Sequence, residues 1–288
     1  MNAALVELAP TDLRADATLT EKELFLRGLM RGLESVLVAF SGGVDSAFLA
    51  LVATQELGAK ALCVTGVSNS LARRELENCR ELARRFNFNH ETIETAELSD
   101  PNYAANPSNR CYFCKSELYG KLQPLAAARG IKWIVDGANV DDLGDYRPGR
   151  QAAREKNVRS PLVEANLSKS EIRELSRALD LPTWDKPASP CLSSRIAYGV
   201  PVTIERLSKI ERGEEILRAH NLKVFRVRSH GDLARIEIAP DEMERVLQKT
   251  TLDELAEQFR ALGFRYVTLD LHGFRSGAMN ESLKGSES

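Results

Sequence analysis

The residues with the clearest chemical meaning are the six from Ser41 to Ser46, which read Ser-Gly-Gly-Val-Asp-Ser. They follow the apolar run 35–40 and precede another apolar stretch, so they are predicted to join a buried strand to a helix. Two glycines let backbone N–H groups approach a phosphate without an intervening Cβ, and the amino end of the helix adds a positive dipole. The pattern predicts a phosphate-binding loop rather than a plain glycine turn. The sequence has no Walker loop, which would place a lysine on the terminal phosphates.

Five cysteines form the second chemical feature of the chain. Cys63 and Cys79 lie within apolar patterns and are predicted to be small buried hydrophobes. Cys111 and Cys114 form a Cys-x-x-Cys pair at the start of a predicted helix, where the helix dipole and neighbouring cations favour thiolates. From the residues alone, this pair is a set of zinc ligands, a dithiol switch or a packing feature.

Cys191 lies in a proline-bounded loop between Lys186 and Arg195. Its cationic flanks favour a thiolate and therefore a nucleophile, and the alternative is an incidental surface thiol. An odd number of cysteines without a secretory signal favours thiol or metal chemistry over a disulfide framework.

Apolar periodicity divides the first two thirds of the chain into alternating strands and helices. Strands are expected at 35–40, 61–67, 90–95 and 133–135, and helices at 20–33, 46–57, 76–86, 112–129 and 168–179. Capping boxes at Thr20-x-x-Glu23 and Ser168-x-x-Glu171 mark two of the helix starts. The alternation predicts an α/β fold with a doubly wound, mostly parallel sheet.

The proline-rich stretch 181–190 cannot remain helical and marks the expected domain boundary. After it, helices at 203–219, 241–248 and 252–262 and strands at 224–227, 234–238 and 266–271 predict a smaller α+β domain. The expected parts are a mobile arm at 1–19, a phosphate-loop domain at 20–185, the smaller domain at 186–276 and a disordered tail at 277–288.

Charge and hydropathy narrow the expected partners of the chain. The 39 lysines and arginines nearly balance the 41 aspartates and glutamates, and a net charge of −2 argues against a broad nucleic-acid footprint. No apolar run approaches the roughly 20 residues that span a bilayer. We expect a cytoplasmic protein without a membrane segment, and the sequence leaves open whether it forms a homo-oligomer.

Seven stretches, found in order along the chain, resemble the LarE family of sulfur transferases within the PP-loop ATP pyrophosphatase superfamily. Besides the glycine loop they are Asn109–Lys115, Asp136–Asp142, Gly144–Gly149, Arg159–Leu162, Lys186–Arg195 and Phe225–Gly231. The resemblance extends from about residue 20 to residue 276. It implies that Ser41, Gly42, Gly43, Val44, Asp45 and Ser46 bind ATP with Mg²⁺, and that the nucleotide-binding domain has the PP-loop fold.

The resemblance also implies a reaction. ATP adenylates a carboxylate of pyridinium-3,5-biscarboxylic acid mononucleotide with release of pyrophosphate, and a cysteine thiolate displaces AMP to form a thioester. Sulfur then stays with the substrate, on the way to the nickel-pincer cofactor of lactate racemase. The residue that matches the nucleophile is Cys191, and a thiolate is the natural attacker of an adenylate.

The Cys-x-x-Cys pair departs from the single-cysteine pattern of part of this family. In members with three cysteines, the resemblance implies a 4Fe-4S cluster whose open iron binds an extra sulfide. We hypothesise that Cys111, Cys114 and Cys191 hold such a cluster. The alternative is a sacrificial route, in which Cys191 gives up its sulfur and becomes dehydroalanine.

Further candidates surround these two features. Asp45 is expected to order the loop or hold Mg²⁺, and Asp141 and Asp142 to face the same crevice, the alternative being a solvated turn. Arg226 and Arg228 alternate along one strand and are expected to clamp the substrate phosphate, with Arg147 and Arg195 as further candidates. The alternative for the strand pair is a plain exposed strand face. Glu214 and Glu237 are candidate ligands of a divalent cation.

Two other functions stay open at this stage. PP-loop enzymes also thiolate tRNA, although the net charge argues against an RNA substrate. A nucleotide-binding iron-sulfur or zinc protein without catalytic activity is the other alternative.

Overall fold

The computed structural model describes residues 16–144 and 147–275. Contacts among these residues define two units: one comprises residues 16–68, Arg73–Thr95 and Cys111–Ser189, and the other Asn69–Ala72, Ala96–Arg110 and residues 190–275. The sequence placed both earlier segments of the second unit in the first domain. The predicted tail and nearly all of the predicted arm lie outside the described residues.

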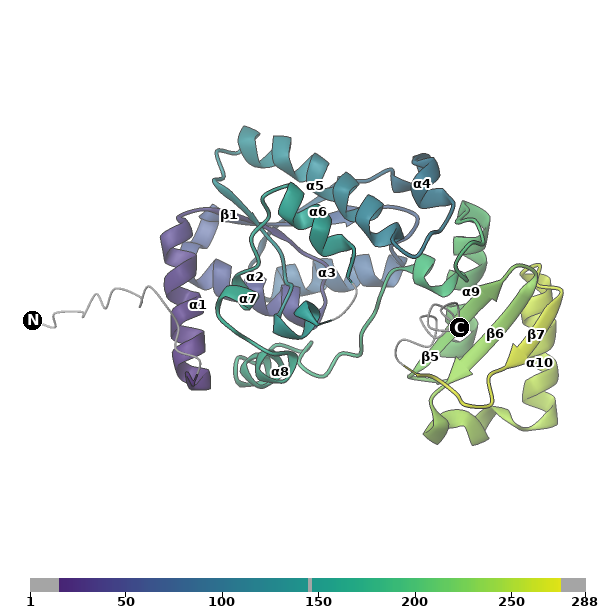
Figure 1. The fold of residues 1–288 in the computed structure, drawn as a ribbon. Coiled ribbons are helices and arrows are strands. Elements are labelled where there is room, and N and C mark those ends of the chain that lie inside the picture. The colour runs from purple at the N-terminus through teal and green to yellow at the C-terminus, as the bar shows by residue number, and fades with distance from the viewer. Residues whose placement is uncertain (1–15, 145–146, 276–288) are drawn as a thin grey trace, which may run out of the picture. The chain divides into compact units, whose positions relative to one another are not determined.

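The first unit contains a four-stranded sheet in the order β3-β2-β1-β4, and all neighbouring strands are parallel (Figure 1). The strands are β1 (Val36–Ala39), β2 (Ala61–Val67), β3 (Asn89–Glu94) and β4 (Trp133–Val135). Parallel neighbours require a crossover between successive strands, and helices supply these crossovers. The predicted parallel α/β sheet is confirmed.

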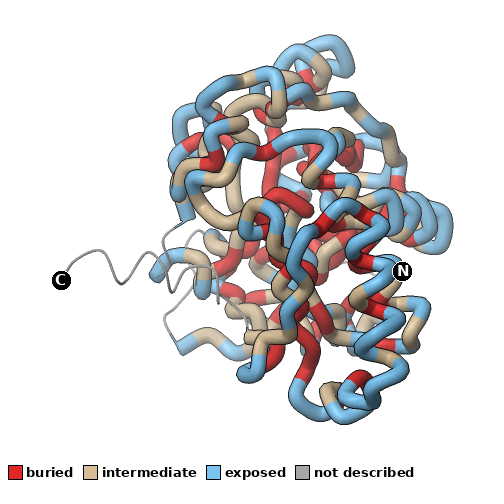
Figure 2. The backbone as a smooth tube through the Cα atoms, turned by 90° about the vertical axis from the view of Figure 1, so that its right-hand side faces the viewer, coloured by how far each residue is buried: buried red, intermediate tan, exposed pale blue. Residues whose placement is uncertain are grey.

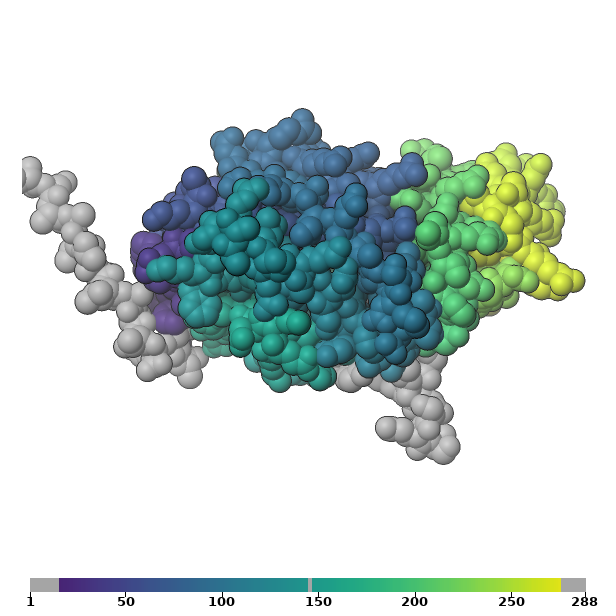
Figure 3. All heavy atoms as spheres, turned by 90° about the horizontal axis from the view of Figure 1, so that it is seen from above, coloured from purple at the N-terminus to yellow at the C-terminus, as the bar shows by residue number. Residues whose placement is uncertain are grey.

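Alternate residues of β1 enter two different cores. Val36 and Val38 pack with α1 (Leu19–Leu33), α2 (Val44–Leu57) and α8 (Lys169–Ala178), whereas Leu37 and Ala39 pack with α5 (Arg110–Ala128) and α6 (Gly149–Glu155). Successive side chains of a strand point to opposite faces, so helices cover both faces of the sheet. The unit also contains α3 (Arg73–Arg85), α7 (Pro161–Glu164) and the short 3₁₀ helices η1 (Gly58–Lys60) and η3 (Val140–Leu143). In the space-filling view of Figure 3, the purple to teal part of the chain presents a continuous surface.

Two predicted helix starts need correction. The first helix is capped by Thr18, whose side chain accepts from the Glu21 N–H, and not by Thr20 with Glu23. Two boxes of the same spacing overlap there, and the pattern cannot rank them. The second helix starts at Val44 instead of Ser46, with Gly43 as its N-cap, so Asp45 and Ser46 belong to its first turn.

The second unit has a mixed three-stranded sheet in the order β5-β6-β7. β5 (Phe225–His230) is antiparallel to β6 (Leu233–Ile238), which is parallel to β7 (Tyr266–Leu269). The remaining elements are η2 (Glu97–Ser99), α4 (Pro101–Ala104), η4 (Leu192–Arg195), α9 (Ile204–Ala219), η5 (Pro240–Val246) and α10 (Lys249–Ala261). The predicted helix at 241–248 is therefore a 3₁₀ helix, which Pro240 begins.

The buried residues lie in the interior of the fold. Figure 2 shows buried segments inside and exposed segments on the outer turns of the backbone. In the second unit the aromatic ring of Phe259 packs against Gly213 of α9, where a Cβ would come within 3.0 Å of the ring. Among the described residues, no helix combines the length and the apolar character needed to cross a bilayer.

Candidate functional site

The glycine loop, residues 41–46, curls around the hydroxyl of Ser46. That oxygen lies 3.2 Å from the Ser41 amide nitrogen and 3.0 Å from the Ser41 hydroxyl. Gly42 has φ +66°, a conformation that favours glycine. Gly43 caps α2 without a side-chain acceptor, so no side chain of the cap occupies the amino end of the helix. This is the geometry of an anion-binding helix terminus.

Close packing on two sides fixes the position of the loop. A Cβ on Gly42 would lie 2.7 Å from Sγ of Cys79 on α3, and one on Gly137 would lie 2.9 Å from the Ser46 amide nitrogen. The side chain of Cys79 is fully buried, and burial raises the pKa of its thiol to about 11. Cys63 is likewise buried, and its thiol pKa is raised to about 12. Cys79 therefore supports the loop as an apolar side chain.

Two lysines from distant parts of the sequence reach the glycine loop. Lys169, the first residue of α8, forms an ion pair with Asp45 at 2.5 Å. Lys186 donates a hydrogen bond of 3.0 Å to the Gly42 carbonyl and pairs with Glu75 of α3 at 2.7 Å. The Walker pattern would place a lysine inside the loop, whereas here two cations approach it from outside.

The predicted acidic residues after β4 lie next to the same helix terminus. Asn139 donates from its side chain to Asp45 at 3.3 Å, and Asp141 accepts the backbone N–H of Lys169 at 2.8 Å. Asp142 accepts the Asn139 N–H at 3.1 Å and pairs with Arg147 at 3.0 Å. The structure thus brings Asp45 and Asp141 to opposite ends of Lys169, while Asp142 holds the turn and Arg147.

A buried polar cluster lies beneath the Cys-x-x-Cys helix. Asp136 accepts hydrogen bonds from the hydroxyls of Tyr119, at 2.9 Å, and Ser160, at 2.8 Å. Burial raises the pKa of Tyr119, and the neighbouring Tyr119 and Asp136 raise that of Lys115. The Lys115 ammonium lies 5.3 Å from the centre of the Tyr119 ring. These contacts anchor the first turns of α5.

Cys111 and Cys114 lie on the first turn of α5, one exposed and the other half-buried. Their i, i+3 spacing puts both thiols on one face of the helix. Within residues 16–144 and 147–275, no group of three His, Cys, Asp or Glu side chains is placed to hold a metal ion. Two thiols are fewer than the three that the hypothesised 4Fe-4S cluster needs, so this donor set does not by itself fit the cluster.

In the second unit, Arg195 holds the backbone of Cys191. Cys191 is half-buried and precedes η4. The buried Arg195 guanidinium donates to the Cys191 carbonyl at 3.0 Å and to the Pro190 carbonyl, and it pairs with Glu214 at 2.9 Å. Arg195 therefore fixes the main chain on which the candidate nucleophile is carried.

A second buried arginine lies in the same unit. Arg228 pairs with the fully buried Glu237 at 2.9 Å and donates to the Ser194 carbonyl at 3.2 Å. Burial, together with the charges of Arg195 and Arg228, lowers the pKa of Arg226 to about 10. One charge cluster around Arg226 thus contains four other residues that were predicted to bind phosphate or a cation: Arg195, Arg228, Glu214 and Glu237. Both carboxylates of the cluster pair with arginine.

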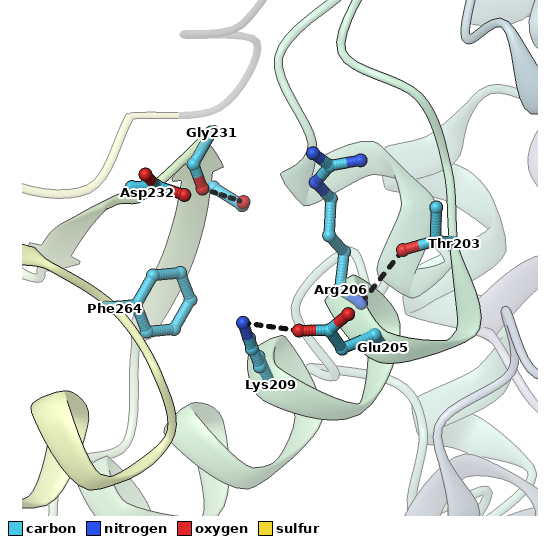
Figure 4. Close-up of a pocket in the computed structure, with 8 residues that line it drawn as sticks. Thr203, Glu205, Arg206, Lys209, Gly231, Asp232 and Phe264 are labelled. Atoms are coloured by element: carbon cyan, nitrogen blue, oxygen red, sulfur yellow. Dashed lines mark hydrogen bonds and ion pairs between the residues drawn. The ribbon is translucent and has the colours of Figure 1, made fainter.

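The second unit also contains a pocket of about 390 Å³ between the start of α9 and the turn after β5. Figure 4 shows the ammonium of Lys209 facing Glu205, and Phe264 on the opposite wall. Lys209 pairs with Glu205 at 2.7 Å. None of the predicted catalytic, binding or metal-ligating residues lines this pocket.

Sequence reasoning missed Glu75 and Lys169 as partners of the loop, and it predicted Lys186 as a cationic flank of Cys191, whereas its ammonium contacts Gly42 and Glu75. A local signal existed for Lys169, because the confirmed capping box of Ser168 and Glu171 places it at the start of a helix. Nothing in the sequence indicates that Glu75 and Lys186 meet. Of the predicted site residues, those of the loop and the acidic turn come together in the first unit.

Comparison with known proteins gives three informative relatives. The chain is 37% identical over 268 residues, or 93% of its length, to the pyridinium-3,5-bisthiocarboxylic acid mononucleotide synthase of Lactiplantibacillus plantarum, and the match covers 96% of that protein. It is 50% identical over 258 residues to an uncharacterized protein of Synechocystis, covering 90% of this chain and 96% of the relative. It is 25% identical over 206 residues to one of the subunits of the glutamine-hydrolysing GMP synthase of Thermoplasma volcanium, covering 67% of this chain and 65% of that protein. No protein-family model matches the chain.

Proposed function

The chain belongs to the LarE family of the PP-loop superfamily, and from this premise we propose that it is an ATP-dependent sulfur transferase. Its substrate is pyridinium-3,5-biscarboxylic acid mononucleotide, and its product is a thiocarboxylate on the way to the nickel-pincer cofactor. The observation that carries the proposal is the 37% identity to a pyridinium-3,5-bisthiocarboxylic acid mononucleotide synthase across nearly the whole of both chains.

The first step is adenylation of the substrate in the glycine loop. A carboxylate oxygen attacks the α-phosphorus of ATP, an O–P bond forms, and the bond to the β-phosphate breaks to release pyrophosphate. The uncapped amino end of α2 and the lysines at 169 and 186 support binding of the β- and γ-phosphates, because they place positive charge around the loop.

Asp45 and Asp141 supply the carboxylate oxygens that Mg²⁺ prefers, and they flank Lys169. Mg²⁺ usually takes one or two carboxylates together with the phosphates of its nucleotide, so this donor set fits the ion. Lys169 then has to leave Asp45, and the phosphates are the natural acceptors for its ammonium.

The second step is attack by Cys191. Its thiolate forms a C–S bond at the acyl carbon, the C–O bond to AMP breaks, and AMP leaves with the bonding electrons. Arg195 supports this role, because it holds the main-chain carbonyl of the nucleophile from a buried, ion-paired position. A fixed backbone limits the orientations of the attacking sulfur.

Sulfur reaches the product when the Cβ–S bond of Cys191 breaks. A base removes the Cα proton, the electrons form a Cα–Cβ double bond, and the thiocarboxylate leaves with the sulfur. This sacrificial route draws its sulfur from Cys191 itself and needs no group beyond the residues of this chain. The cluster of Cys111, Cys114 and Cys191 stays a prediction, which anaerobic reconstitution with iron and sulfide tests against a Cys114→Ala variant.

The charge cluster of the second unit is the proposed site for the substrate phosphate. Burial and the neighbouring positive charges lower the pKa of Arg226 in this cluster. Binding of the substrate's phosphate dianion would therefore be favoured beside Arg226. Arg195 and Arg228 add fixed positive charge, and Arg147 and the divalent cation at Glu214 and Glu237 stay predictions.

Intact-mass analysis tests the sulfur source directly. Anaerobically purified protein is incubated with ATP, Mg²⁺ and the pyridinium mononucleotide, and pyrophosphate, thiocarboxylate and protein mass are followed together. The proposal expects pyrophosphate release and loss of the elements of H₂S at Cys191 in step with product. Product without any change in protein mass would contradict the sacrificial step, and no pyrophosphate would contradict the adenylation.

A further inference from the structure

The segment that leads to Cys191, residues 186–191, is attached to the glycine loop through Glu75. Lys186 begins this segment. Its ammonium donates a hydrogen bond of 3.0 Å to the Gly42 carbonyl and pairs with Glu75 at 2.7 Å. Ser189 donates its hydroxyl to the other oxygen of Glu75 at 3.0 Å. One carboxylate therefore holds two residues of the segment.

The same helix carries both contacts to the loop. Glu75 and Cys79 are four residues apart on α3, so they share one helix face. Cys79 packs beneath Gly42, and Glu75 orients the ammonium that binds the Gly42 carbonyl. Burial opposes ionisation of Glu75, but the Lys186 pair and the hydrogen bonds from Ser189 and Asn78 outweigh it, and the pKa is lowered. Glu75 is thus a fixed anion at neutral pH.

The segment itself is stiff. Pro187 and Pro190 lock their own φ at about −65° and keep the residues before them extended. On its far side, Arg173 of α8 donates to the carbonyls of Trp184, at 2.6 Å, and Lys186, at 2.9 Å. Backbone rotation is therefore restricted at several positions between Trp184 and Cys191.

We propose that Glu75 and Lys186 are positioning residues that couple occupancy of the glycine loop to the conformation of the segment that leads to Cys191. The inference rests on the proposed function, since it takes the phosphates of ATP as the occupant of the loop. The Lys186 ammonium lies at the loop, so a bound phosphate adds an anionic partner beside the Gly42 carbonyl. ATP then tightens the Cys191 segment before the adenylate forms.

Hydrogen exchange read by mass spectrometry tests the coupling in the full-length protein. The variants are Glu75→Gln and Ser189→Ala, and the matched control is Glu56→Gln, which removes a carboxylate that pairs with Arg27 and Arg31 on the same unit. Peptides that span the loop and residues 186–192 are compared with and without ATP and Mg²⁺.

In the wild type and in the control, ATP should slow exchange in both peptides. In Glu75→Gln, ATP should still protect the loop with little change in ATP KM. The ATP-dependent protection of 186–192 should disappear, and the rate of thiocarboxylate formation should fall on the order of tenfold to a hundredfold. Ser189→Ala should shift both quantities in the same direction by a smaller factor.

The inference is overturned if ATP protects 186–192 equally in the wild type and in Glu75→Gln. A wild-type loop that ATP does not protect at all would contradict the proposed function instead. In that case the ATP-free samples still test whether Glu75 holds residues 186–189. Without ATP, the 186–192 peptide of Glu75→Gln should exchange faster than that of the control. Equal exchange rates would refute this role of Glu75.

Discussion

Replacing Gly42 with alanine should destabilise the first unit through two separable effects. The first is the backbone conformation, since φ is +66° and a left-handed residue costs an L-amino acid about 1–2 kcal/mol. The lower entropy of the unfolded alanine chain offsets about 0.4–1 kcal/mol of that. The second effect is steric, because the new Cβ would lie 2.7 Å from Sγ of Cys79, and such overpacking costs about 1–3 kcal/mol.

The matched control for the backbone effect is Gly130→Ala. Gly130 has φ +63° and no atom within 4 Å of an added Cβ, so only the conformational cost applies. We expect a loss of about 1 kcal/mol for this control and about 2–4 kcal/mol for Gly42→Ala. Adding Cys79→Ala removes the clashing sulfur, so the double-mutant cycle should return a favourable coupling of about 1–3 kcal/mol.

Urea unfolding followed by tryptophan fluorescence measures these differences in the right unit. The chain has two tryptophans, Trp133 and Trp184, and both belong to the first unit. A steric clash at Gly42 is contradicted if Gly42→Ala loses no more stability than Gly130→Ala, or if Cys79→Ala does not restore stability in the double variant.

Two further predictions concern lysine and thiol chemistry. Lys169→Met should weaken ATP·Mg²⁺ binding about tenfold or more, because a charge-assisted hydrogen bond to phosphate is lost. Lys132→Met, which removes an exposed partner of Glu34, should bind as the wild type does in the same calorimetric titration, and equal affinities of the two variants would exclude Lys169 from the site. In native protein at pH 8, iodoacetamide should modify the exposed Cys111 first. Cys63 and Cys79 have thiol pKa values raised to about 12 and about 11, so they should stay unmodified and form thiolate only as the pH rises toward those values. Peptide mapping identifies the modified cysteines. If it finds either buried thiol modified as fast as Cys111, the assignment of that thiol to the core is contradicted.

Local sequence patterns were sufficient to predict the structural features that depend only on nearby residues in the chain. The apolar run before Ser41 predicted a buried strand, and the structure confirms one at Val36–Ala39 with both faces covered. The two glycines predicted a loop at the amino end of a helix, and they lie there. Periodicity and backbone conformation act over a few residues, so the sequence displays them directly.

Long-range pairs were not accessible in the same way. Lys186 lies 111 positions from Glu75, and no local preference connects them. Segments 69–72 and 96–110 belong to the second unit although they interrupt the predicted first domain. Their assignment depends on tertiary contacts such as the hydrogen bond between Tyr103 and Ser193, at 2.6 Å. A single sequence has no periodic signal for contacts of this kind.

The Cys191→Ser variant under turnover conditions tests the proposed sulfur transfer most directly. With ATP, Mg²⁺ and the pyridinium mononucleotide, it should still release pyrophosphate, because adenylation uses the glycine loop and not the thiol. It should form no thiocarboxylate, since a serine oxygen cannot supply sulfur. Thiocarboxylate formed by this variant at the wild-type rate would contradict the central role of Cys191.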